Sequence, residues 1–164
     1  MPAIRSKIWL VVFTLFTTGL LACSDSTGPG GGGGGGGGDD DSRSDLSGEW
    51  AFDVTLDVAD YELTCSADSR LSLTQASGRG TIGGTFSDGK ITCTYPGGSE
   101  SGEFTGQIQG TRNGDNVSFT DDEGCAYEGT VGGNDNRMQG TVTCPDVEGA
   151  AVRGTWSATL TDSD

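Results

Sequence analysis

The chain has 164 residues, of which 24 are acidic and 9 are basic, so its formal net charge at neutral pH is −15. This surplus argues against nucleic acid as a partner, because phosphates would be repelled, and it favours a soluble monomer. The absence of histidine excludes a serine–histidine–aspartate centre, while 30 glycines and only 32% hydrophobic residues favour short strands and tight turns.

Residues 1–22 have the pattern of an export signal. Arg5 and Lys7 give a positive start, and the apolar run 8–21 is too short to span a bilayer comfortably as a helix. Removal of this segment would leave 7 basic and 24 acidic residues, a net charge of −17. The competing interpretation is an ordinary signal peptide, or a membrane helix, followed by a chance cysteine.

The segment ends in Leu20-Leu21-Ala22-Cys23, which resembles the lipobox of bacterial lipoproteins. The resemblance implies a diacylglycerol on the Cys23 thiol, cleavage before Cys23, and acylation of the new amino terminus with a fatty acid such as palmitate. Two or three acyl chains hold a protein stably at a membrane. Because Ser24 follows instead of an acidic residue, the resemblance favours the outer membrane over the inner one. Whether the protein faces the periplasm or the outside stays open.

Residues 23–45 are predicted to be a disordered linker behind the lipid-bearing Cys23. They contain the nine glycines Gly30–Gly38 and then Asp39–Asp41, and such a composition cannot form a core. A glycine-rich coil of about 20 residues reaches roughly 25 Å, which would lift a domain clear of the lipid headgroups. A calcium site at Asp39–Asp41 would need more convergent oxygens on a shaped loop, so a solvated tether is the better interpretation.

Residues 46–161 are predicted to form one small all-β domain, an antiparallel up-and-down barrel. Period-two alternation of apolar residues begins at Trp50 and Phe52. A unit of the form apolar-x-Gly-x-apolar then recurs around Gly84, Gly106, Gly129, Gly140 and Gly154. We expect these glycines on the inner face, where the missing side chains let a sheet curve and close.

The predicted strands are separated by residues that favour turns. Hairpin turns are expected at 87–89, 113–116 and 134–136, and a longer loop is expected to start at Tyr95. Short connections pair sequential neighbours, which predicts a closed meander of eight or nine strands, wide enough for side chains or one small ligand. The segment 59–69 is either a short strand or a long loop. The expected strands are 48–58, 70–76, 80–86, 90–95, 103–112, 116–120, 125–132, 137–144 and 152–160.

Gly48-Glu49-Trp50 at the start of the first strand resembles the Gly-x-Trp of lipocalins and of avidin-like barrels. The resemblance implies a small β-barrel that binds an apolar ligand. In lipocalins an arginine near the last strand packs on that tryptophan, and Arg153 would take this role by a cation–π contact, although the alternation points Arg153 outward. The biotin site of avidin is not carried over, since only Trp50 and Trp156 would remain in the processed chain.

Once Cys23 is set aside for lipid, four cysteines remain: Cys65, Cys93, Cys125 and Cys144. An even number in an exported domain predicts two disulfides. If the hairpin loop is 134–135, Cys125 lies opposite Cys144, and the second bridge joins Cys65 to Cys93. Zinc binding and cysteine catalysis are disfavoured, because the chain has no Cys-x-x-Cys pair and no histidine.

No catalytic residue, metal site or cofactor is predicted. Glycosidases use a pair of carboxylates, and composition alone does not exclude one, but Asp57, Glu103 and Glu128 alternate with inward residues and should face solvent. The run 121–123 lies in an expected turn, where three solvated acids are a better interpretation than a calcium site. The glycine-rich stretches do not match a phosphate-binding loop or a dinucleotide fingerprint.

Seven aromatic residues fall on the predicted inner face: Trp50, Phe52, Phe86, Phe104, Phe119, Tyr127 and Trp156. They would either pack as a core or line an apolar pocket. The leading hypothesis is therefore a membrane-anchored lipoprotein of the bacterial cell envelope that binds a small apolar ligand in its barrel without catalysis. The alternative is a non-catalytic structural or interaction module with a filled core. An enzyme is the third and weakest hypothesis.

Overall fold

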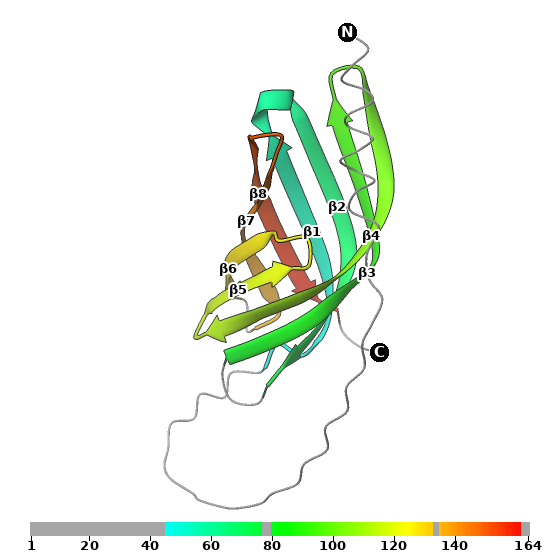
Figure 1. The fold of residues 1–164 in the computed structure, drawn as a ribbon. Coiled ribbons are helices and arrows are strands. Elements are labelled where there is room, and N and C mark those ends of the chain that lie inside the picture. Colours follow the sequence, from blue (N-terminus) through cyan, green and yellow to red (C-terminus); the bar gives the residue numbers. More distant parts are fainter. Residues whose placement is uncertain (1–44, 77–79, 133–134, 162–164) are drawn as a thin grey trace, which may run out of the picture. The chain divides into compact units, whose positions relative to one another are not determined.

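The computed structural model describes residues 45–76, 80–132 and 135–161, which form a closed antiparallel barrel (Figure 1). The predicted signal peptide, the lipobox with Cys23, and the linker up to residue 44 lie outside the described residues. Each strand pairs with its neighbours in the chain, and the last pairs with the first, so the predicted all-β, up-and-down meander is confirmed. The strands are β1 (Gly48–Val58), β2 (Leu63–Gln75), β3 (Gly80–Tyr95), β4 (Gly98–Asn113), β5 (Asn116–Asp121), β6 (Ala126–Gly132), β7 (Arg137–Val147) and β8 (Ala150–Leu160).

The prediction of separate strands at 80–86 and 90–95 is wrong, because β3 runs through both. The segment Ser87-Asp88-Gly89 is a bulge and not a hairpin turn: the pairing of β3 with β4 shifts between Phe86 and Gly89. Asp88 has a φ of 53°. An aspartate that tolerates positive φ serves a bulge as well as a turn, and the bulge bends the strand as it passes along the barrel.

Two connections also differ from expectation. The loop expected from Tyr95 is a two-residue turn, with Pro96 and Gly97 between β3 and β4 and a φ of 101° at Gly97. Proline followed by a glycine of positive φ is the residue pair that a type II turn requires. The undecided segment 59–69 contains a short 3-10 turn, η1 (Ala59–Tyr61), after which β2 begins at Leu63.

The inward glycines lie where a neighbouring strand passes closest. A Cβ at Gly154 would collide with the carbonyl oxygen of Thr55 on β1, and a Cβ at Gly140 would collide with that of Glu128 on β6. A Cβ at Gly129 would lie 2.7 Å from the Trp156 ring. The wall therefore curves most sharply at positions without a side chain, as the repeated glycine unit predicts.

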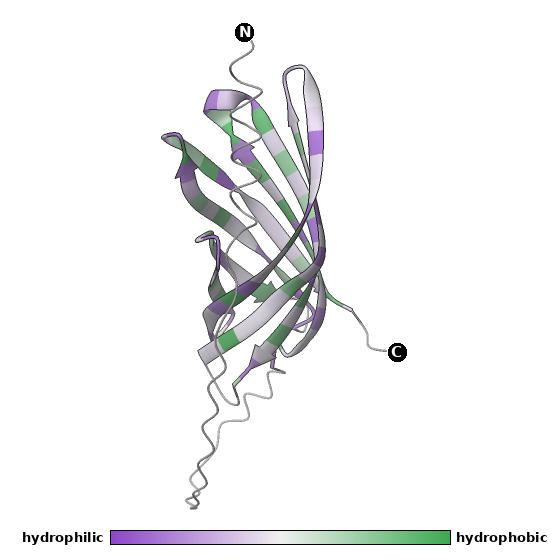
Figure 2. Ribbon diagram, turned by 45° about the vertical axis from the view of Figure 1, so that its right-hand side comes forward, coloured by the Kyte–Doolittle hydropathy of each residue, from purple (hydrophilic) through white to green (hydrophobic). Residues whose placement is uncertain are grey.

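Apolar side chains fill the barrel along its axis, and hydrophobic residues alternate along the strands (Figure 2). At the end where the domain begins, Leu46 and Trp50 have no exposed surface. Trp50 Nε1 donates to the Leu46 carbonyl at 3.0 Å, and the Leu46 amide donates to Gln75 Oε1 at 2.9 Å. These bonds hold Leu46 as an apolar stopper in this end of the barrel.

Arg153 does not pack on Trp50 as the lipocalin resemblance implies. Arg153 is exposed and lies opposite Asp57 on β1, whereas Trp50 faces the core. The period-two alternation therefore describes Arg153 correctly, and the resemblance does not. The buried arginine of this barrel is Arg112 on β4, whose guanidinium contacts the Asp135 carboxylate at 2.7 Å.

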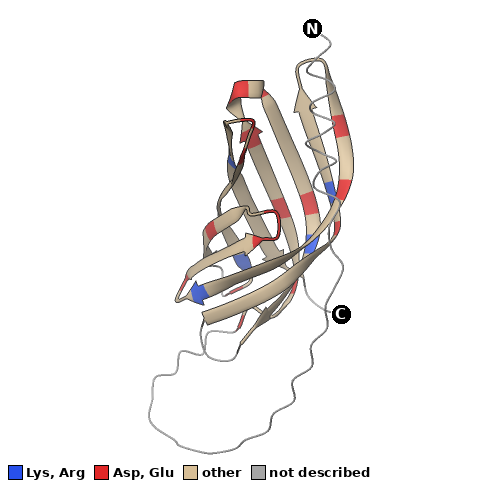
Figure 3. Ribbon diagram, viewed as in Figure 1, with Lys and Arg blue, Asp and Glu red and all other residues tan. Residues whose placement is uncertain are grey.

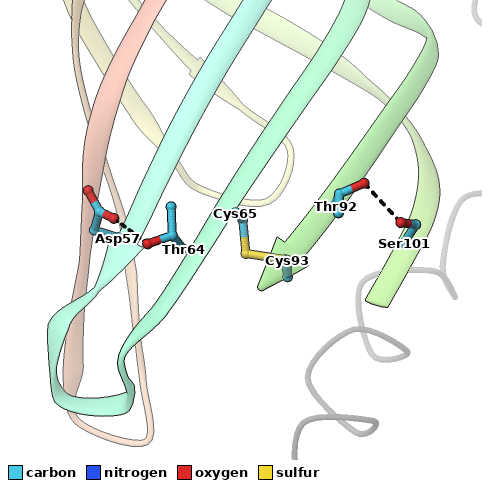
Figure 4. The surroundings of a disulfide bond; sticks show 6 residues. All are labelled: Asp57, Thr64, Cys65, Thr92, Cys93 and Ser101. Atoms are coloured by element: carbon cyan, nitrogen blue, oxygen red, sulfur yellow. Dashed lines mark hydrogen bonds between the residues drawn. A yellow bond between two sulfur atoms is a disulfide. The ribbon is translucent and has the colours of Figure 1, made fainter. Parts of the chain in front are cut away.

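The two predicted disulfides are present. Cys65 on β2 is bonded to Cys93 on β3 (Figure 4). Cys125 is bonded to Cys144 on β7. Cys65 and Cys93 lie directly opposite each other in the strand ladder, and Cys125 immediately precedes the pair of Ala126 with Thr143, in line with Cys144. In both bridges the Cα atoms are 3.9 Å apart. The register of β6 on β7 thus agrees with the spacing argument made from the sequence, while the expected loop falls partly outside the described residues. Both bridges lie toward the end opposite the Leu46 stopper.

The barrel wall is uneven in height. β4 has 16 residues, whereas its neighbour β5 has 6 and β6 has 7. β5 pairs with β4 only along Ile108–Asn113, so the β3–β4 hairpin extends well beyond β5 and β6 (Figure 1). The wall is therefore lowest between β4 and β7, at the disulfide end.

Candidate functional site

The seven aromatic residues singled out in the sequence meet inside the barrel. Six of them are buried, with exposed fractions of 6% or less, while Phe104 is half-buried. Period-two alternation on six strands brings them together, because each takes an inward position. The set is therefore a single cluster in space, as either interpretation of it requires.

The rings in this cluster pack against one another. The ring centroids of Phe119 and Tyr127 are 4.6 Å apart, those of Phe52 and Phe86 are 4.9 Å apart, and those of Phe119 and Trp156 are 5.2 Å apart. Such distances are those of rings in direct contact. Because the rings touch from β1 across to β5, β6 and β8, they occupy the space that a ligand in the middle of the barrel would need.

One polar group lies inside the barrel without a partner. Ser69 on β2 is 9% exposed, and its hydroxyl makes no hydrogen bond in the described part of the chain. It stands beside the β3 bulge, where the pairing of β2 with β3 shifts between Asp68 and Arg70. The position follows the inward period of Leu71 and Leu73, so the alternation could have indicated it.

Asp121 is not the solvated turn residue that the sequence analysis expects. It ends β5 in the inward period of Phe119, and its carboxylate is half-buried. The Tyr127 hydroxyl donates to Asp121 Oδ2 at 3.1 Å, and the Cys125 amide donates to Oδ1 at 2.8 Å. From the sequence, Asp121 is placed in a turn because the preceding strand is expected to end at residue 120. The spacing of two residues from the inward Phe119 was a signal that Asp121 also points inward.

Burial is the main cause of the shifted pKa values around Asp121. It raises the pKa of the Asp121 carboxyl, the two hydrogen bonds oppose the rise, and the nearby Asp122 charge adds to it. Burial also raises the pKa of Glu123, and the neighbouring Asp122 and Asp121 charges add to that rise. The pKa of the Tyr127 hydroxyl rises strongly, first through burial and then through the Asp121 charge. The loop 121–123 therefore concentrates negative charge at the low part of the wall.

The other acids named in the sequence analysis lie on the outer face. Asp57, Glu103 and Glu128 are exposed, as predicted, and the Asp57 carboxylate accepts a hydrogen bond from Thr64 at 2.8 Å (Figure 4). Within the described ranges, no group of three or more acids and cysteines is arranged to hold a metal ion.

The outer wall has two open depressions. One lies over β2, β3 and β4 around Gly83 and Gly110, and the other lies over β1, β6, β7 and β8 around Gly129 and Gly140. Exposed threonines line both of them. The described residues that line them form no convergent set of reactive side chains.

Comparison with family models, with curated proteins and with solved structures finds no match for this chain. In the part of the chain that the structure describes, no helix is long and apolar enough to cross a membrane.

Proposed function

We propose that this protein is a lipid-anchored module of the bacterial cell envelope that acts without catalysis, through contacts made by the surface of a filled β-barrel. The observation that carries the proposal is the buried ring cluster, in which Phe52 and Phe119 each contact both Tyr127 and Trp156 across the barrel. It favours the core-packing interpretation of the aromatic residues over the pocket interpretation.

A ligand in the middle of the barrel would have to displace these rings. Protein cores are packed as densely as organic crystals, so a guest needs a void or a side chain that can move aside. Tyr127 is held by its hydrogen bond to Asp121, and Trp156 Nε1 donates to the Thr141 carbonyl at 3.1 Å. Two of the rings that a bound ligand would have to displace are therefore held to the barrel strands by hydrogen bonds.

The anchor is supported by the sequence alone. Leu20-Leu21-Ala22-Cys23 resembles a lipobox, follows a positively charged start and an apolar run, and is followed by a glycine-rich linker. A tether of roughly 25 Å would hold the barrel away from headgroups that repel its negative charge. The outer membrane is the expected site, since Ser24 follows Cys23.

The anchor is tested by expressing the full chain and its Cys23→Ala variant in a bacterium that processes lipoproteins. The parent should fractionate with membranes and carry the mass of a diacylglycerol and a fatty acid on an amino-terminal Cys23. The variant should be released in soluble form. A variant that still fractionates with membranes would contradict the lipid anchor.

The filled core is tested separately by native mass spectrometry after incubation of the full chain with a bacterial lipid extract. We expect the mass of the protein without a retained small apolar molecule in its barrel. A stoichiometric adduct whose binding is abolished by a change at Phe52 or Phe119 would restore the ligand-binding hypothesis instead.

A further inference from the structure

The first half of β4 has a strand partner on one side only. From Gly98 to Gly106 it pairs with β3, and its pairing with β5 begins at Ile108. The last backbone contact on the β5 side is the Asp122 amide, which donates to the Gln107 carbonyl at 3.1 Å. Among the described residues, the stretch 98–105 therefore presents an open edge of about 25 Å.

The pairing pattern shows which groups face this edge. In an antiparallel ladder, alternate residues direct both backbone groups to the same neighbour. Gln107 directs its carbonyl to the β5 side, so the residues two, four, six and eight positions before it do the same: Thr105, Glu103, Ser101 and Ser99. The side chains of these four residues are exposed on the outer face. The edge is thus a complete template for one further strand.

The edge carries acidic residues, but it lacks the lysine, proline and shortness that protect many other edges. Natural edge strands carry lysine or proline, or are very short, so that they do not pair with other chains. The segment 98–105 contains neither lysine nor proline. Its charged residues are Glu100 and Glu103, which would repel the same edge of a second, equally acidic copy. A partner that adds here should therefore be positively charged.

The surroundings of the edge carry the same sign of charge. The loop between β5 and β6 is acidic (Figure 3), with Asp121, Asp122 and Glu123. The bond from the Asp122 amide to the Gln107 carbonyl places this loop at the Gln107 end of the edge. β5 runs antiparallel to β4 and ends at this loop. An added antiparallel strand would start there, with its amino-terminal ammonium beside three acids. A parallel strand would bring its carboxylate to the same acids, which charge repulsion disfavours.

The inner side of the edge carries an aromatic ring at Phe104 and an acid at Glu100, whose carboxylate accepts a hydrogen bond from the Tyr95 hydroxyl at 3.1 Å. Phe104 is half-buried, packs edge-on against Phe86 with ring centroids 6.0 Å apart, and follows Gly102 on the inner face. A residue of an added strand opposite Phe104 would point to the same face and cover its ring. On the outer face the matching residues would lie opposite Glu103. Around Phe104 and Glu103 the edge therefore suits a strand that alternates apolar and basic side chains.

From these relations we propose that the open edge of β4 binds an extended, basic segment of another polypeptide as an added antiparallel strand. Main-chain hydrogen bonds supply the affinity in such strand addition, and alternate side chains supply the specificity. The inference builds on the proposed function, because it assigns a surface and a partner chemistry to the interaction module.

The test uses the full chain and a peptide of about eight residues that alternates lysine and valine, with a free amino terminus. Residue-resolved amide exchange is measured by NMR with and without this peptide. At a peptide concentration about tenfold above its Kd, the amides of Ser99, Ser101, Glu103 and Thr105 should exchange about tenfold more slowly. The amides of Gly102 and Phe104, which face β3, should change little. A peptide alternating glutamate and valine should protect none of them.

Variants of the edge give a second readout. Ser101→Pro removes a backbone donor that faces the open side, so no backbone hydrogen bond of the barrel is lost, and it should weaken peptide binding at least about tenfold. Ser101→Ala is the matched control, because both variants lose the 2.9 Å contact of the Ser101 hydroxyl with Thr92 (Figure 4). If Ser101→Pro fails to fold, methylating alternate backbone nitrogens of the peptide replaces it. Only the set that faces β4 should abolish binding.

Several results would overturn the proposal. One is equal binding of the lysine–valine peptide by Ser101→Pro and Ser101→Ala. Others are slower amide exchange at positions elsewhere on the barrel, or no binding of the peptide at all. Amides at the four edge positions that are protected without peptide would also overturn it, since another part of the chain or a second copy would then occupy the edge. An edge without a partner would leave the lipid anchor and the filled core standing, because membrane fractionation and native mass spectrometry test those separately.

Discussion

Tyr127 and Asp121 are joined by a hydrogen bond at the lowest part of the barrel wall, with the hydroxyl 3.1 Å from Oδ2 of the carboxylate. The other oxygen of the same carboxylate accepts the Cys125 amide. One half-buried side chain therefore ties the end of β5 to the start of β6 and to the Cys125–Cys144 bridge. The shortest strands of the barrel depend on a group that titrates.

Asp121 should make stability depend on pH. Burial, reinforced by Asp122, raises its pKa in the folded protein above the unfolded value, so the folded state binds this proton more tightly. The free energy of unfolding should therefore fall as the pH rises through the interval between those two values. Chemical denaturation between about pH 4 and pH 7 measures this slope. Asp121→Asn, which keeps an oxygen for the Cys125 amide, should flatten it.

The matched control for that experiment is Glu128→Gln, which also removes one negative charge but from an exposed position on β6. It should retain the slope of the parent protein. If Asp121→Asn and Glu128→Gln flatten the curve equally, the effect belongs to the overall negative charge and not to the buried carboxylate.

Gly154 should not tolerate a methyl group. A Cβ there would collide with the Thr55 carbonyl of β1, so Gly154→Ala should lower the free energy of unfolding by about 2 kcal/mol or more. Gly132→Ala is the control, because a Cβ at Gly132 meets no atom within 4 Å, and the change should stay within about 1 kcal/mol. Equal effects in urea denaturation would mean that close strand approach does not explain the inward glycines.

Phe119 should behave as a core residue. Its side chain is 3% exposed and contacts both Tyr127 and Trp156, so Phe119→Ala should cost about 3–5 kcal/mol of unfolding free energy. The resulting apolar void should also bind benzene, which would raise the melting temperature of the variant but not that of the parent. Tyr61→Ala, at a residue 40% exposed, should change stability by about 0.5 kcal/mol at most. A parent protein stabilised equally by benzene would show that the barrel already holds a void.

Removing the Cys125–Cys144 bridge should cost about 3 kcal/mol, since it closes a loop of 19 residues. The double variant Cys125→Ser/Cys144→Ser should also exchange the amides of β5 and β6 faster, because these short strands have little other pairing at that end. The comparison variant is Cys65→Ser/Cys93→Ser, which removes a bridge between two long, fully paired strands. Its faster exchange should be confined to β2 and β3. Identical exchange patterns would contradict this local role.

Several features of the fold follow from local pattern. β1 occupies the predicted residues 48–58, because period-two alternation is set by backbone geometry and the inner face must be apolar. The Cys125–Cys144 pair follows from a hairpin, in which opposed positions have a constant sum once the loop is known. The glycine unit predicts curvature because a missing Cβ lets the sheet bend at the glycine itself, so the effect can be located from the sequence.

Other features were decided by tertiary structure. Ser87-Asp88-Gly89 has the chemistry of a turn, and it became a bulge because β2 and β4 both continue past it. Asp121 is polar by composition, and it is half-buried because β5 ends beside Tyr127. The open edge of β4 is a difference in length between strands that pair only in the folded barrel. By itself the sequence determined the strand periodicity and the cysteine pairing, which are local or arithmetic properties, while the export signal stays a prediction. Only closure of the barrel decided which side chains fill it and which backbone groups lack a neighbour, since both depend on strands far apart in the chain.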